Sequence, residues 1–264
     1  MDPTPFSTII DSIYQEHNHY NVTLPADWLQ GRTAYGGLSA ALCLEATNRS
    51  LPDLPPLRSA QFSFIGPATR QLNISPNVLR RGKSTVFVGT DLNGESGLAV
   101  RSSLCFGSQR GSTHDHDFLP MPKASRPDEC DSYYVWQNRP NFMNHFEGRL
   151  VKGALPFTSG TDPEMIVWLR HNDTGDDSSL VRLLALADAL PPAALVMSSD
   201  FIPISTMTWS IEILDTKPFT SKGWWLVHAV AETSREGYST QNTFIWNSEG
   251  KPILTARQNV AIFG

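Results

Sequence analysis

The sequence contains little cysteine, and the three residues present are poorly placed for cross-linking. Cys43, Cys105 and Cys130 are odd in number, and no CxxC spacing occurs. This argues against a disulfide framework or a structural zinc site and favours a reducing compartment. No apolar run approaches the roughly 18 residues that span a bilayer. Residues 1–20 have no long apolar core and are not typical of a signal peptide, so we expect a cytoplasmic protein with no membrane partner.

Motifs of several common enzyme classes are also missing. No Gly-x-Ser-x-Gly sequence occurs, which leaves a serine hydrolase elbow unsupported. Gly82-Lys83-Ser84-Thr85 looks like the end of a phosphate loop, but Asn77 stands where that motif requires glycine. His114-Asp115-His116 could bind a metal, although its polar surroundings favour a flexible loop. We therefore expect neither a bound metal nor a cofactor.

The charge balance is unremarkable for a globular protein. The 264 residues carry a formal net charge of −5, and 40% of them are hydrophobic. A weakly acidic chain of this kind argues against nucleic acid as the main partner. Its length suits one large domain or two domains of about 130 residues each.

What the sequence does contain is a repeated β-rich pattern. Gly82-Lys83-Ser84-Thr85 and Gly237-Tyr238-Ser239-Thr240 each begin such a run. Both runs include a turn and end in Phe-Gly, at Phe106-Gly107 and at Phe263-Gly264. Two copies of one β unit predict two packed, pseudo-equivalent domains.

Each half also contains one apolar segment typical of a buried helix. The first is expected over 38–46, after the glycine pair Gly36-Gly37, and the second over 180–190, where Pro191-Pro192 stops it. Residues 1–19 are compatible with another short helix. Strand patterns occur at 61–65, 72–80, 84–91, 98–106, 142–150, 165–170, 204–214, 224–234, 239–247 and 253–263.

This order of elements predicts an α+β fold made of two tandem units. Each unit would be an antiparallel sheet wrapped around a central buried helix, so that the apolar faces of helix and sheet cover each other. Joining the two sheets edge to edge would also cover their open edges. We expect the first unit over 1–110, a connecting segment over 111–140, and the second unit over 141–264.

A set of short motifs runs through both halves of the chain. In the first half these are Tyr35-Gly36-Gly37, Gln61-Phe62-Ser63-Phe64, Gly66-Pro67, Leu79-Arg80-Arg81-Gly82-Lys83-Ser84 and Asn93-Gly94. In the second half they are Leu186-Ala187-Asp188-Ala189-Leu190, Ile204-Ser205-Thr206-Met207, Gly223-Trp224-Trp225-Leu226, Gly237-Tyr238 and Arg257-Gln258-Asn259. Their order and spacing resemble the double-hotdog acyl-CoA thioesterases, the TesB-like (type II) family, over nearly the whole chain apart from roughly 108–140.

The resemblance implies two tandem hotdog domains and hydrolysis of an acyl-CoA thioester to a free acid and coenzyme A. The family is similar in using an Asp on the second helix, a Thr on the following strand and a Gln on the last strand, which match Asp188, Thr206 and Gln258. The sequence departs at Thr208-Trp209, where the better-known bacterial members carry Asp-His, and this bears on substrate preference. Proteins of this kind often associate, so a homo-oligomer is compatible with the resemblance.

Asp188, Thr206 and Gln258 also suit thioester hydrolysis chemically. A thiolate leaving group has a pKa near ~8.5, so a strong general acid is not needed. Asp188 could accept the proton of a water held by Gln258 and Thr206. It is the only charge in 183–190, and burial in an apolar stretch raises the pKa of a carboxylate. The alternative for Asp188 is a structural carboxylate, and Gln258 and Thr206 are also typical of ordinary strands.

Further candidates would bind the substrate. Backbone N–H groups of Gly36 and Gly37 are possible oxyanion donors at a helix start, and Arg80 and Arg81 could meet the phosphates of coenzyme A, with a solvated strand end as the alternative. The first half has leucine and alanine where an acid would lie on its helix, and Arg101 falls near the position of Gln258, so we expect one active site, in the second half.

Two other functions remain open at this stage. One is a non-catalytic acyl-CoA-binding module with a degenerate site. The other is a hydroxyacyl-thioester dehydratase or hydratase, which requires a histidine with its acid; no histidine lies near Asp188 in the sequence.

Overall fold

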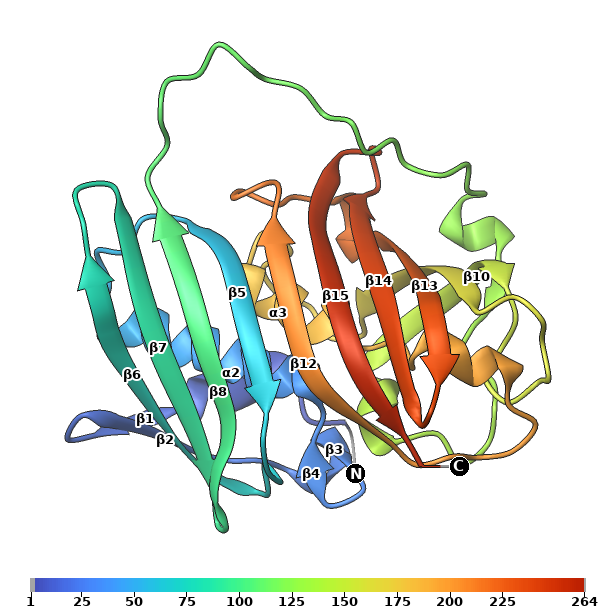
Figure 1. Ribbon diagram of the computed structural model, residues 1–264, viewed down its shortest axis with the longest axis horizontal. Coiled ribbons are helices and arrows are strands. Elements are labelled where there is room, and N and C mark those ends of the chain that lie inside the picture. The colour runs from blue at the N-terminus through green and yellow to red at the C-terminus, as the bar shows by residue number, and fades with distance from the viewer. Residues whose placement is uncertain (1–2, 264) are drawn as a thin grey trace.

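The computed structural model describes residues 3–263 and contains a large antiparallel sheet with helices on one face (Figure 1). The sheet has 13 strands in the order β1-β2-β6-β7-β8-β5-β12-β15-β14-β13-β11-β10-β9. Its strands are β1 Tyr14–Glu16, β2 His19–Thr23, β5 Leu57–Phe64, β6 Gln71–Arg81, β7 Thr85–Gly94, β8 Gly97–Gly107, β9 Asp131–Ser132, β10 Phe146–Gly153, β11 Glu164–His171, β12 Ile204–Ile213, β13 Trp225–Arg235, β14 Tyr238–Asn247 and β15 Pro252–Ile262. The short strands β3 (Leu29–Gln30) and β4 (Thr33–Ala34) pair separately.

Period-two burial explains why these segments form strands. In β7, Val86, Val88 and Leu92 are buried on the face that the helices cover, while Phe87 points to the opposite, exposed face. Alternation of this kind is the signature of a strand with one covered face. The predicted α+β class is therefore confirmed.

The two halves meet at the pairing of β5 with β12. Gln61 lies opposite Ser210 and Phe62 opposite Trp209, in antiparallel register. The edge-to-edge joining predicted from the sequence is thus confirmed. It gives the open edge of each half-sheet a hydrogen-bonded partner within the same chain.

The α-helices are α1 (Phe6–Asp11), α2 (Gly36–Ser50) and α3 (Leu180–Ala187). Figure 1 shows α2 and α3 behind the sheet, where their apolar side chains fill the core. The start of α2 contacts the end of α3, because Gly37 lies against Ala185 and Asp188. At the other end, Leu44 of α2 and Leu180 of α3 border the same small cavity. The two helices therefore run side by side in opposite directions.

Two predicted elements differ from the structure. The strand expected over 142–150 begins only at Phe146, because Asn141–His145 winds into a 3-10 helix. There Phe142 stacks on Tyr35 and His145 on Trp28, each with ring centroids 4.0 Å apart, and these contacts outweigh the local strand preference. The helix expected to reach residue 190 ends at Ala187, and Asp188 is its C-cap residue. The peptides before Pro191-Pro192 disfavour further helix.

The segment that connects the halves crosses from β8 to the second half and then covers part of the sheet's outer face (Figure 1). The indole N–H groups of Trp168 and Trp246 donate to the carbonyl oxygens of Ser125 and Leu119, at 2.9 and 3.0 Å. The remaining short helices are the 3-10 turns Ala26–Trp28, Pro127–Glu129, Ala193–Met197 and Ser221–Gly223. Within residues 3–263, no helix combines the length and apolar character needed to cross a bilayer. The domain boundaries at 110 and 140 stay a prediction.

Candidate active site

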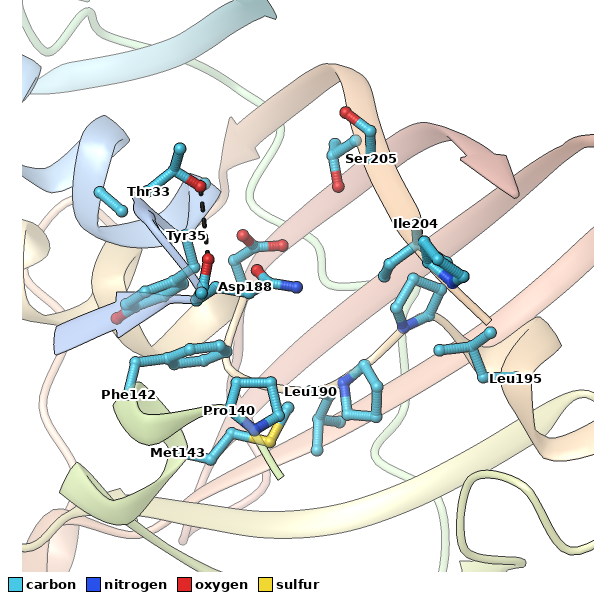
Figure 2. A pocket seen from close by; sticks show the side chains of 18 of the residues that line it. Thr33, Tyr35, Pro140, Phe142, Met143, Asp188, Leu190, Leu195, Ile204 and Ser205 are labelled. Atoms are coloured by element: carbon cyan, nitrogen blue, oxygen red, sulfur yellow. Dashed lines mark hydrogen bonds between the residues drawn. The ribbon is translucent and has the colours of Figure 1, made fainter. Parts of the chain in front are cut away.

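A cavity of about 1000 Å³ opens where the start of α2 meets the end of α3. Both halves of the chain line it, and Asp188, Thr206 and Gln258 all border it together with Gly36. Figure 2 shows the Asp188 side chain in this cavity, with Tyr35 and Phe142 nearby. Most other lining side chains are apolar or aromatic, namely Phe64, Val100, Trp136, Pro140, Phe142, Met143, Pro156, Phe157, Leu190, Pro191, Pro192, Leu195, Phe201, Ile202, Pro203 and Ile204.

Asp188 receives one hydrogen bond on each carboxylate oxygen. The backbone N–H of Gly37 donates to Oδ2 at 2.8 Å, and the Gln258 amide nitrogen donates to Oδ1 at 2.5 Å. Burial raises the pKa of Asp188 from 3.8 to about 6, and these two donors limit the rise. The side chain is surrounded by protein but keeps some accessible surface on the cavity side. Such a carboxylate is mostly ionised at neutral pH and can still accept a proton.

The glycine pair is required by the closeness of the two helices rather than by an unusual backbone angle. A Cβ atom on Gly36 would lie 2.7 Å from Asp188 Oδ2, and one on Gly37 would lie 2.8 Å from the Ala185 carbonyl oxygen. Tyr35 strengthens the same junction, because its buried hydroxyl donates to that carbonyl at 3.0 Å. The first half of the chain therefore builds one wall of a site whose carboxylate comes from the second half.

Gln258 is held by a residue that sequence reasoning missed. Gln241 on β14 lies opposite Gln258 on β15, and its amide nitrogen donates to the Gln258 side-chain oxygen. Both side chains are buried, at 4% and 5% exposure. The available signal was the repeat itself: the residue after Thr85 is Val86, whereas the residue after Thr240 is Gln241.

Thr206 borders the cavity from β12 without a hydrogen bond to the other two predicted residues. Among residues 3–263, no hydrogen bond joins its side chain to Asp188 or Gln258. A bulge separates Thr206 from Thr208 in the pairing with β15. Thr208 is exposed and Trp209 is buried beside Phe62, with ring centroids 5.9 Å apart. Neither is among the cavity-lining residues, so this departure from the family pattern lies outside the cavity wall.

The predicted substrate-binding residues are only partly brought together. Gly36 borders the cavity, and Gly37 contacts Asp188 through an N–H group that is thereby already occupied. Arg80 and Arg81 lie at the end of β6, are exposed, and are not among the lining residues. Arg81 instead pairs with Asp53, at 3.1 Å. The strand carries both arginines away from the junction of the helices.

Cross-strand register shows what the first half has in place of this site. Val86, which the sequence repeat aligns with Gln241, lies opposite Phe106, whereas Gln241 lies opposite Gln258. Arg101, expected near the position of Gln258, lies opposite Asp91 and forms an exposed ion pair with it at 2.6 Å. Phe106 borders a cavity of about 270 Å³ at the other ends of the helices, whose lining within the described residues includes no ionisable side chain.

Comparisons with known proteins agree with this architecture. A family model described as the acyl-CoA thioesterase N-terminal domain matches residues 24–107, and one described as the C-terminal domain matches residues 117–262. A search of curated protein sequences finds no match.

Solved structures share the fold over nearly the full length. A hot dog fold protein of unknown function from Alicyclobacillus acidocaldarius is 20% identical with a TM-score of 0.89, covering 99% of each chain. A putative thioesterase II from Thermobifida fusca YX is 18% identical with a TM-score of 0.84, covering 100% of this chain and 99% of its own. An acyl-CoA thioesterase II, TesB2, from Mycobacterium marinum is 16% identical with a TM-score of 0.75, covering 96% of each. With family models matching both halves of its tandem hotdog fold, the chain belongs to the acyl-CoA thioesterase family.

Proposed function

We propose that the protein hydrolyses acyl-CoA thioesters to a free carboxylic acid and coenzyme A, with Asp188 as the general base. One observation carries the proposal: Asp188, whose pKa is raised to about 6, is the only charged residue that lines the cavity within residues 3–263. A general base works best when its pKa lies near the operating pH.

In the proposed reaction, a water molecule gives one proton to Asp188 while its oxygen attacks the thioester carbonyl carbon. The resulting tetrahedral intermediate collapses with cleavage of the carbon–sulfur bond, and the thiolate leaves. Asp188 then returns the proton to the departing sulfur or to solvent. Because the thiol of the leaving group has a pKa near ~8.5, the thiolate can leave without a separate strong acid.

Gln258 and Thr206 would orient the attacking water. The Gln258 amide uses one N–H on Asp188, so its second N–H is free to contact a water or the substrate carbonyl. Thr206 supplies a hydroxyl on the β12 side of the cavity. The start of α2 adds a positive helix-dipole end beside the reacting groups, which favours a developing oxyanion. Since Gly37 N–H is committed to Asp188, that N–H is not the oxyanion donor.

The lining of the cavity favours an uncharged acyl group. Its walls are mainly aromatic, aliphatic and proline side chains, and no lysine, arginine or histidine among the described residues borders it. A charged acyl chain would be desolvated there without an opposite charge. A dehydratase reading has no support in this cavity, since such chemistry needs a histidine beside the acid.

The test is release of free thiol from a panel of acyl-CoA substrates of increasing chain length. We expect turnover by the wild type and a loss of about 10²–10⁴-fold in Asp188→Ala, the usual contribution of a general base. Asp53→Asn is the matched control, because that carboxylate is exposed and pairs with Arg81 outside the cavity. The proposal fails if no substrate releases thiol, or if Asp188→Ala retains wild-type turnover.

A further inference from the structure

A continuous chain of hydrogen bonds runs from the backbone of the second half to Asp188. It begins at the N–H of Ala193, which follows Pro191-Pro192 and donates to the Gln241 side-chain oxygen at 2.9 Å. Gln241 donates in turn to the oxygen of Gln258, and Gln258 donates to Asp188. Every group between the two ends is buried.

The backbone end fixes the direction of this chain. An amide side chain can present either its oxygen or its nitrogen, but a backbone N–H can only donate. The Gln241 oxygen must therefore face Ala193, and its NH₂ group must face Gln258. Gln258 then has to present its oxygen to Gln241 and its NH₂ group to Asp188. Reversing either amide would set donor against donor or acceptor against acceptor between side chains that are almost fully buried.

We propose that Gln241 is a positioning residue, which holds the Gln258 amide in the orientation that donates to Asp188 and aims its second N–H at the cavity. The catalytic consequence of this inference rests on the proposed function. The hydrogen-bond chain from Ala193 to Asp188, called the relay below, is a property of the folded protein. Gln241 is not among the cavity-lining residues and acts only through Gln258.

Few other ionisable groups face this relay. Tyr35, beside the start of α2, and Tyr134, whose hydroxyl donates to the Ala189 carbonyl at 3.1 Å, are both buried, and burial raises the pKa of each. Both are therefore neutral at physiological pH. The protonation of Asp188 is thus controlled mainly by burial, Gly37 and the Gln258 amide.

Gln241→Leu removes the donor to Gln258 while keeping a side chain of similar size. We expect kcat to fall by about 10²-fold with little change in KM, because misplacing a water-orienting group by about 1 Å costs that much. The acidic limb of the pH–rate profile should also move to higher pH, since Asp188 loses a reliable donor. Thr243→Val is the matched control: Thr243 is buried on the same strand but is not a cavity-lining residue.

Gln241→Glu provides a second, nearly isosteric test. A protonated carboxyl at this position can accept from Ala193 and donate to Gln258, whereas an ionised one can only accept. Activity in this variant should therefore require a protonated side chain at 241 and an ionised Asp188, which gives a narrow bell-shaped pH profile. Wild type and Thr243→Val should keep a plateau above the acidic limb.

Carbon NMR titration of the Asp188 carboxyl reads the relay without any turnover. We expect its pKa to be higher in Gln241→Leu than in wild type or Thr243→Val. Unchanged kcat, pH profile and Asp188 titration in the Gln241 variants would overturn the relay while leaving the hydrolase intact. A wild type that hydrolyses no acyl-CoA but shows the expected NMR shift would instead overturn the proposed function and keep the relay. If Gln241→Leu fails to fold, the same NMR titration of Asp188 in Gln241→Glu tests the relay.

Discussion

The acidity of Asp188 makes a quantitative prediction for the pH dependence of hydrolysis. Its pKa is raised to about 6 by burial, against the lowering effects of Gln258 and Gly37. The carboxylate is then about 91% ionised at pH 7 and about 9% ionised at pH 5, so kcat/KM should fall about tenfold between these values. An aspartate with an ordinary pKa near ~3.9 would lose less than about a tenth of its activity over the same range.

The direction of this pH dependence follows from which protonation state of Asp188 reacts. The base must be ionised, so activity is present above the folded-state pKa and is lost as pH falls through about 6. The same shift acts on stability in the opposite direction. Because the folded pKa lies above the unfolded one, ionising Asp188 lowers the free energy of unfolding as pH rises, by about 2 kcal/mol between pH 4 and pH 7.

The assay is initial-rate thiol release with dithiodipyridine, which reports free thiol in acid, at substrate concentrations well below KM. Circular dichroism at each pH separates loss of catalysis from unfolding. Gln258→Leu should move the acidic limb to higher pH, because it removes one of the two donors that stabilise the carboxylate. A profile that stays flat down to pH 5 in folded protein, or a limb near pH 4, would refute the assignment of Asp188 as the titrating base.

Three further substitutions test the geometry. Gly36→Ala should lower kcat by about 10²-fold, since its Cβ would lie 2.7 Å from Asp188 Oδ2. Gly82→Ala is the control, because a Cβ there has room, and it should leave kcat unchanged. Equal rates in the two variants would contradict the tight junction of α2 and α3. The double variant Arg80→Ala, Arg81→Ala should leave KM for acyl-CoA unchanged and the free energy of unfolding within about 1 kcal/mol of wild type, because the one ion pair broken is exposed. A KM raised about tenfold or more would show that these arginines bind the substrate. Tyr35→Phe leaves the buried Ala185 carbonyl without its donor and should cost about 1–3 kcal/mol in urea unfolding, while an unchanged midpoint would argue against that bond.

Local patterning was enough to predict most of the fold. The alternating residues of β7 and the apolar segment that became α2 each bury one face, and this preference can be read from sequence alone. The stop at Pro191-Pro192 was also visible, although the helix ended earlier than expected, at Ala187. The strand expected from residue 142 was wrong in its first turn, because Phe142 and His145 found aromatic partners far away in the chain.

The candidate site could be predicted only in part. Asp188 was visible as the only charge in 183–190, and Thr206 and Gln258 followed from the family resemblance; the structure places all three around one cavity. Gln241 was missed because its importance depends on lying opposite Gln258 across two strands. Arg80 and Arg81 were chosen for their charge, and only the course of β6 shows that they lie away from the cavity.

The sequence by itself determined the two tandem β units, the apolar character of both helices and the single acid that distinguishes the second half from the first. Tertiary structure alone decided that Gly37 donates to Asp188 across 151 positions of the chain, and that Gln241 sets the orientation of Gln258. The preference of a segment for burial depends only on the residues of that segment. The partners of a buried carboxylate depend on strand register and on how closely two helices approach, and these are fixed only when the two halves pack together.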